Sequence, residues 1–82
     1  MIENFTKIVQ SASNAIEMRS RVDFVSKWFE ITFDFGTDTV RIIYDNEFFS
    51  EPLFFVFRNE EKSFCTNKIE SAIDFAFEQK KA

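Results

Sequence analysis

The sequence predicts a small α+β domain in which a helix, an antiparallel meander of three or four strands and a second helix follow one another. Three observations support this prediction. Apolar residues recur at helical spacing near both ends of the chain, and they alternate with polar residues in the middle. A run of five apolar residues, Leu53 to Phe57, directly follows Pro52 and needs cover on both faces. We expect both helices on one face of the sheet, which gives two layers.

The first helix is predicted to run from Ile2 to about Arg19. Apolar residues three or four positions apart form one stripe along it, and they are Ile2, Phe5, Val9, Ala12 and Ile16. The segment from Ser20 to Lys27 fits either a continuation of this helix or the entry to a strand. We interpret it as a connection that leads into the sheet.

The residues from Trp28 to Phe35 alternate with a period of two and predict a half-buried strand. The side expected to face the core consists of Phe29, Ile31, Phe33 and Phe35, and the other side of Trp28, Glu30, Thr32 and Asp34. The only glycine, Gly36, begins a tight turn, because a positive φ is least costly there. The second strand is predicted from Val40 to Tyr44, antiparallel to the first.

The third strand is predicted from Leu53 to Phe57, and the pattern alone does not fix which of its residues face the helices. A short fourth strand from Lys62 to Cys65 is possible. The last helix begins near Asn67, which with Glu70 resembles a capping box. Its buried residues are predicted to be Ile69, Ala72, Ile73, Ala76 and Phe77.

Composition limits the classes of function. The 82 residues form one domain, 1–82, and the 13 phenylalanines supply bulk for a small core. The net charge of −4 disfavours direct binding to nucleic acid. A single cysteine, the absence of a signal sequence and the absence of a membrane-spanning apolar run predict a soluble, cytoplasmic protein that binds no membrane.

The sequence offers little for catalysis. There is no histidine to act as a general base or metal ligand, and one glycine excludes a glycine-rich phosphate loop. We interpret Cys65 as a small buried filler rather than a nucleophile. The acidic residues fall in predicted turns, where carboxylates are normally solvated. We therefore expect no enzymatic activity, no cofactor and no metal.

The sheet face opposite the helices is the remaining candidate for function. An aromatic patch with a rim of carboxylates is typical of a protein-binding surface. The candidate partner-binding residues are Trp28, Ile43, Asp45, Glu47, Phe48, Phe49 and Glu51. Alternatively, Phe48 and Phe49 fold back as a lid, and Trp28 packs under the segment from Ser20 to Lys27.

These observations favour a small, non-catalytic protein that inhibits or modulates another protein by blocking its surface. Short acidic α+β domains of this type resemble inhibitors made by phages and mobile elements, some directed against host defence. Abundant Phe, Ile, Asn and Lys indicate an AT-rich genome, as in many bacteria and their viruses. The alternatives are a homo-oligomeric assembly subunit that buries its aromatic face or an edge strand, and an acidic nucleic-acid mimic. Binding of a small apolar ligand ranks last.

Overall fold

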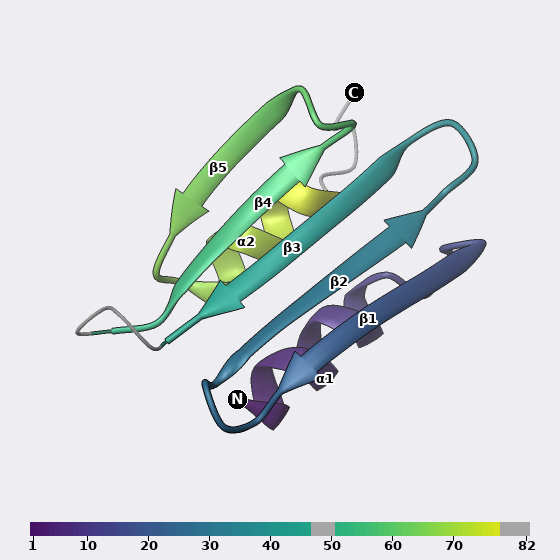
Figure 1. Cartoon of the computed structure of the whole chain (residues 1–82). Helices are drawn as coiled ribbons and strands as arrows, with labels where there is room; N and C mark the ends of the chain where they lie inside the picture. The colour runs from purple at the N-terminus through teal and green to yellow at the C-terminus, as the bar shows by residue number, and fades with distance from the viewer. Residues whose placement is uncertain (47–50, 78–82) are drawn as a thin grey trace.

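Five antiparallel strands form one sheet in chain order, and both helices lie behind it in the view of Figure 1. The computed structural model describes residues 1–46 and 51–77. The elements, in order, are α1 (Ile2–Ser11), β1 (Glu17–Asp23), β2 (Trp28–Asp34), β3 (Thr39–Asp45), β4 (Leu53–Arg58), β5 (Lys62–Thr66) and α2 (Ile69–Phe77). Each strand pairs with the next along the chain, so β1 and β5 are the two edges of the sheet.

The core lies between the sheet and the helices. Alternate residues of the three central strands supply most of it, and they are Phe29, Ile31, Phe33, Val40, Ile42, Tyr44, Phe54 and Val56. The helices and the residue after α1 add four more, which are Ile8, Ala12, Ala72 and Ala76. Phe29 stacks on Tyr44 at 4.8 Å between ring centroids and meets Phe5 of α1 edge-on at 5.3 Å. The predicted inward face of the strand from Trp28 to Phe35 is thus the core face.

The prediction of a helix that begins at Ile2 was right, but its predicted length was wrong. Helix α1 ends at Ser11 rather than Arg19: Ala12 leaves helical geometry with φ −112° and ψ 43°, and the Ser11 hydroxyl donates to the Lys7 carbonyl at 2.9 Å. Serine competes for main-chain groups in this way and weakens a helix. The chain then turns and enters β1, which uses the last residues of the predicted helix and the first part of the predicted connection. The sheet therefore has five strands, not three or four.

The remaining elements lie close to their predicted positions. The β2–β3 turn contains Gly36 with φ +94°, and its N–H donates to the Asp34 carboxylate at 2.8 Å. The fourth predicted strand is present as β5, and α2 has the predicted buried residues Ala72 and Ala76. The α+β class with an antiparallel sheet is confirmed. Neither helix of the described residues has the length and apolar character required to cross a membrane.

The predicted cap of α2 differs from the observed one. The Asn67 side chain donates to Glu51 Oε2 at 2.8 Å instead of turning toward the helix. The Thr66 hydroxyl accepts from the Lys68 N–H at 3.1 Å and so supplies the local turn before α2.

Candidate protein-binding surface

The sheet face opposite the helices, called here the open face, has no layer packed against it among the described residues (Figure 1). Strand register arranges its side chains in rows that cross the sheet. From one end of the sheet, the rows are Asp23–Trp28–Asp45–Leu53, Arg21–Glu30–Ile43–Phe55–Cys65, Arg19–Thr32–Arg41–Phe57–Ser63 and Glu17–Asp34–Thr39.

Four large side chains in the first two rows form what we call the apolar block: Trp28, Ile43, Leu53 and Phe55. All four are half-buried, and the strand register places Ile43 directly opposite Phe55. Neighbouring side chains on one face of an antiparallel sheet lie close enough to pack in this way. The block is therefore a preformed apolar surface on the central strands of the sheet.

A chain of ion pairs crosses the open face beside the apolar block. Glu30 accepts from Arg21 at 3.1 Å and from Arg41 at 3.2 Å, and Arg41 also donates two hydrogen bonds to Glu60, at 2.8 and 3.1 Å. The Arg41 guanidinium lies 4.5 Å from the Phe57 ring centroid, and the Arg21 guanidinium lies 5.4 Å from that of Trp28. The two arginines thus bind carboxylates and stack on aromatic rings at the same time.

The same contacts shift two titrations. The hydrogen bonds from Arg41 lower the pKa of the Glu60 carboxyl, and those to Glu60 raise the pKa of the Arg41 guanidinium. Both groups stay charged at neutral pH. The carboxylate at the centre of the open face, Glu30, is bonded to two cations, so it does not present a free negative charge.

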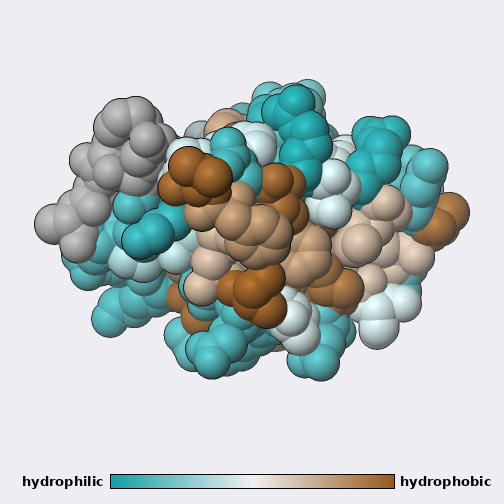
Figure 2. Space-filling view, turned by 60° about the horizontal axis from the view of Figure 1, so that its bottom comes forward, coloured by the Kyte–Doolittle hydropathy of each residue, from teal (hydrophilic) through white to brown (hydrophobic). Residues whose placement is uncertain are grey.

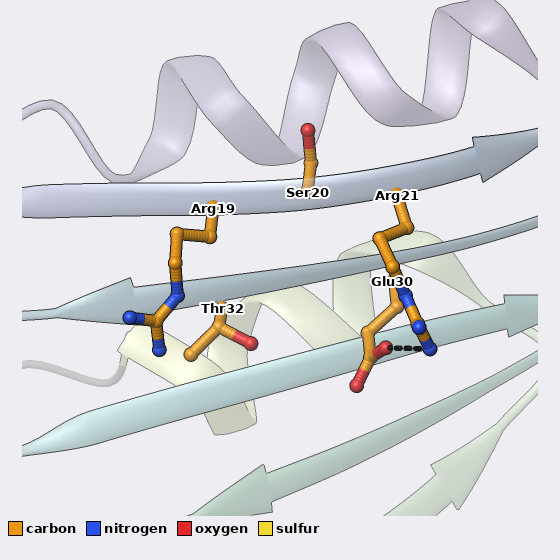
Figure 3. A pocket seen from close by; sticks show the side chains of 5 residues that line it. All are labelled: Arg19, Ser20, Arg21, Glu30 and Thr32. Atoms are coloured by element: carbon orange, nitrogen blue, oxygen red, sulfur yellow. Dashed lines mark hydrogen bonds and ion pairs between the residues drawn. The ribbon is translucent and has the colours of Figure 1, made fainter.

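At the β1 side of the open face there is a shallow hollow of about 500 Å³ (Figure 3). The side chains of Arg19, Arg21, Glu30 and Thr32 point to this side of the sheet, whereas Ser20 points to the helix side. Arg21 is neutralised by Glu30, while Arg19 adds a further positive charge above Thr32. The hollow therefore suits an acidic side chain that approaches the β1 edge of the sheet.

The structure brings together three of the predicted binding residues. Trp28, Ile43 and Asp45 lie in adjacent rows of the open face. The alternative placed Trp28 under the segment from Ser20 to Lys27. One contact of this kind is present, since the Arg21 guanidinium of that segment lies over the Trp28 ring. Glu51 lies apart, hydrogen-bonded to Asn67 next to α2. The predicted residues Glu47, Phe48 and Phe49 lie outside the described part of the chain.

The sequence analysis missed a second surface, called here the β1 edge. It consists of exposed apolar residues on and around β1, together with one from α1: Ile2, Ile16, Met18, Val22, Phe24 and Val25. Figure 2 views the molecule from the side of α1 and β1 and shows apolar residues gathered in the middle of that side, with hydrophilic residues around them. The available signal was the alternation of Met18, Ser20 and Val22 with four charged residues.

The described residues do not assemble a metal site, since no three cysteine or acidic side chains are grouped for it. Cys65 is exposed on β5, so its interpretation as a buried filler was wrong. Comparisons with models of protein families, with curated proteins and with solved structures found no match to this chain. The function must be inferred from these surfaces.

Proposed function

We propose that this chain is a small non-catalytic protein that binds another protein through the open face and blocks the surface it covers. One observation supports the proposal above all others. The apolar block places Trp28, Ile43, Leu53 and Phe55 in two adjacent rows of a sheet face that no other element of the described residues covers. An aromatic and aliphatic centre with charged groups at its margin is the usual composition of a protein interface.

The charges around the block favour a protein partner over nucleic-acid mimicry. A mimic requires a row of free carboxylates, but Glu30 is bound by Arg21 and Arg41, and Arg41 also holds Glu60. The interface would instead combine apolar contact with arginines that are already oriented by their carboxylates. A preformed surface loses less conformational entropy on binding, which suits an inhibitor or modulator. We expect it to act in the reducing cytoplasm, where the exposed thiol of Cys65 stays free.

The test is affinity capture from the native cell with the wild-type chain and two matched variants as bait. Ile43→Lys places a charge in the apolar block, and Val25→Lys makes the same kind of change at a residue that is 93% exposed on the β1 edge. A partner bound through the open face should be retained by wild type and Val25→Lys. Ile43→Lys should weaken binding by about 30-fold or more, as expected for the centre of an interface.

Circular dichroism and thermal melts must show that both variants fold. Capture of the same partner by wild type and Ile43→Lys with equal affinity would refute the open face as the binding surface. Failure of all three baits to retain any protein would count against the proposed function as a whole.

A further inference from the structure

Strand β1 is an edge with hydrogen-bonding groups available to a further strand. Among the strands of the described residues, its only neighbour is β2. The Phe35 N–H bonds to Asp38 in the β3 direction, and the Asp34 carbonyl accepts from the Ile16 N–H in the β1 direction. The N–H and C=O groups of successive residues point alternately toward the two neighbouring strands. Those of the even-numbered residues of β2 therefore point to β1. Their partners on β1 are odd-numbered, so the main-chain groups of Met18, Ser20 and Val22 point away from the sheet.

On the helix side of β1, two apolar side chains remain partly exposed in the described part of the chain. They are Met18 and Val22, 43% and 38% exposed, while Phe5 of α1 packs on Phe29 of β2. The other edge is different, since Phe64 of β5 stacks on Phe75 of α2 at 4.9 Å. Edge strands of monomeric proteins are usually protected by proline, by inward-pointing charges or by a covering element. Strand β1 has no proline, and its four charged residues all lie on the open face.

The sequence of β1 is nearly the same in both directions. It has an acidic residue at each end, then an apolar residue, then arginine, with Ser20 at the centre. In a register centred on Ser20, an antiparallel copy of the strand places Met18 opposite Val22 on the helix side. If the two strands are centred on Ser20, however, like charges are opposed, because Glu17 meets Asp23 and Arg19 meets Arg21. Like charges directly opposite one another destabilise a strand pair.

A shift of two residues removes most of this repulsion. Glu17 then lies opposite Arg21 of the second copy, and the same pair occurs again across the two-fold axis. In this register Met18 and Ser20 form a main-chain hydrogen-bonded pair, which uses the groups that point away from β2. Arg19 meets its own copy at the axis, where Glu17 of the other strand lies diagonally beside it. Within one chain, Glu17 lies opposite Asp34, so it lacks a cationic cross-strand neighbour.

The hollow at the β1 side fits this register. In Figure 3 the side chains of Arg19 and Arg21 lie on either side of Thr32 at this hollow. A second copy in the shifted register brings its Glu17 directly opposite Arg21 and diagonal to Arg19. Closely spaced pairs that are not joined by main-chain hydrogen bonds bring side chains nearest to one another. The positive charge beside the hollow therefore suits Glu17 of the second copy.

We propose that two copies of this chain pair through β1, antiparallel, with Glu17 of each copy opposite Arg21 of the other. The result is a two-fold symmetric dimer with one continuous ten-stranded sheet. Met18 and Val22 of both copies then lie along the seam on the helix side of the sheet. The open faces of the two copies form one extended surface. This inference does not rest on the proposed function, since the dimer uses the β1 edge and leaves the apolar block free.

Sedimentation equilibrium of the full chain tests the proposal with three variants. Glu17→Lys turns two attractive cross-strand pairs into repulsive ones, so the dimer dissociation constant should rise by about tenfold or more. The same change should not harm the single chain, because the introduced ammonium group then faces Asp34. Ser20→Pro removes an outward N–H, which an edge strand tolerates, and should give a monomer. Glu61→Lys makes the same change of charge in the β4–β5 turn and should leave the dimer unchanged.

A wild-type chain that is monomeric up to about 1 mM would overturn the proposal, as would a dimer that is unchanged by Glu17→Lys. Circular dichroism must show that each variant folds. If Ser20→Pro fails to fold, Glu17→Lys decides alone. Capture of the partner by the Ser20→Pro monomer would show that the open face works without the dimer, so the two proposals can fail separately.

Discussion

At the scale of single residues, Phe54 and Phe55 show how one position along a strand decides a side chain's role. Phe54 is 2% exposed and packs against Tyr44 in the core, whereas Phe55 is half-buried on the open face beside Ile43. The alternation of a strand places adjacent residues on opposite faces. In such an apolar run, one set of alternate residues packs in the core, and the other set lies on the candidate binding surface.

These two neighbours give a matched prediction. Phe54→Ala should cost about 3–5 kcal/mol, which is most of the stability of so small a domain, because it leaves a cavity in the core. Phe55→Ala should cost about 1 kcal/mol, because the side chain is only half-buried and no cavity forms. Urea unfolding of both variants measures the difference. Equal losses would show that the open face is packed as tightly as the core.

The ion pair between Arg41 and Glu60 predicts a dependence of stability on pH. Because Arg41 lowers the folded-state pKa of Glu60, the carboxylate contributes stability that is fully present above its unfolded pKa of about 4.3 and is lost as pH falls through the lower folded value. The contribution is at most about 1 kcal/mol, since Glu60 is 58% exposed. The variant Glu60→Gln should be less stable than wild type at neutral pH, and the gap should close as pH falls below the lowered folded-state pKa of Glu60. A gap that is the same at neutral pH and in acid would exclude this linkage.

At the scale of elements, the sequence predicted the central strands and missed β1. The strands β2 and β3 could be predicted because the apolar residues of one face alternate without interruption, and β4 because its five consecutive apolar residues need cover on both faces. In β1, Ser20 interrupts the apolar alternation. Ala12 and Ile16 also continue the helical spacing of α1 by coincidence, although the helix ends before both. An edge strand with no helix over it has no need of a fully apolar face, so its pattern is weak.

The candidate site was predictable in part for the same reason. The outward positions of Trp28 and Ile43 follow from their strands' alternation, but the ion pairs of Arg41 do not. They depend on the β4–β5 turn, which brings Glu60 beside β3 although the two residues are 19 positions apart. Contacts of this kind depend on register, which a local pattern does not determine.

The β2–β3 hairpin gives a prediction at the scale of an element. Gly36→Ala should destabilise the protein by about 1–2 kcal/mol, because φ is +94° and a side chain with a Cβ is strained there. The new methyl group would also lie 3.1 Å from Ile16 Cδ1, but that is the end of an exposed side chain and is able to move. Gly36→Asn should cost less, since asparagine tolerates positive φ better. Thermal unfolding compares the two, and a neutral Gly36→Ala would show that the turn readily relaxes.

At the scale of the whole molecule, stability should be graded across the sheet. The core-facing residues of β2, β3 and β4 are buried, and each of these strands has a neighbouring strand on both sides. All seven residues of β1, by contrast, are exposed. Amide hydrogens exchange through local opening, which is easiest where few apolar contacts must break. We therefore expect the slowest exchange in the three central strands and faster exchange in β1.

Exchange measured residue by residue in β1 should also report its pairing. In dilute solution, the amides of Arg19 and Arg21, which face β2, should be protected, whereas those of Met18, Ser20 and Val22 should exchange freely. In concentrated solution, pairing with a second copy should protect Met18 and Ser20 as well, while the central strands change little. The Ser20→Pro variant controls for concentration alone and should keep its Met18 amide unprotected throughout. If that protection rises equally in wild type and variant, the concentration effect arises elsewhere on the molecule, and β1 is only a frayed edge.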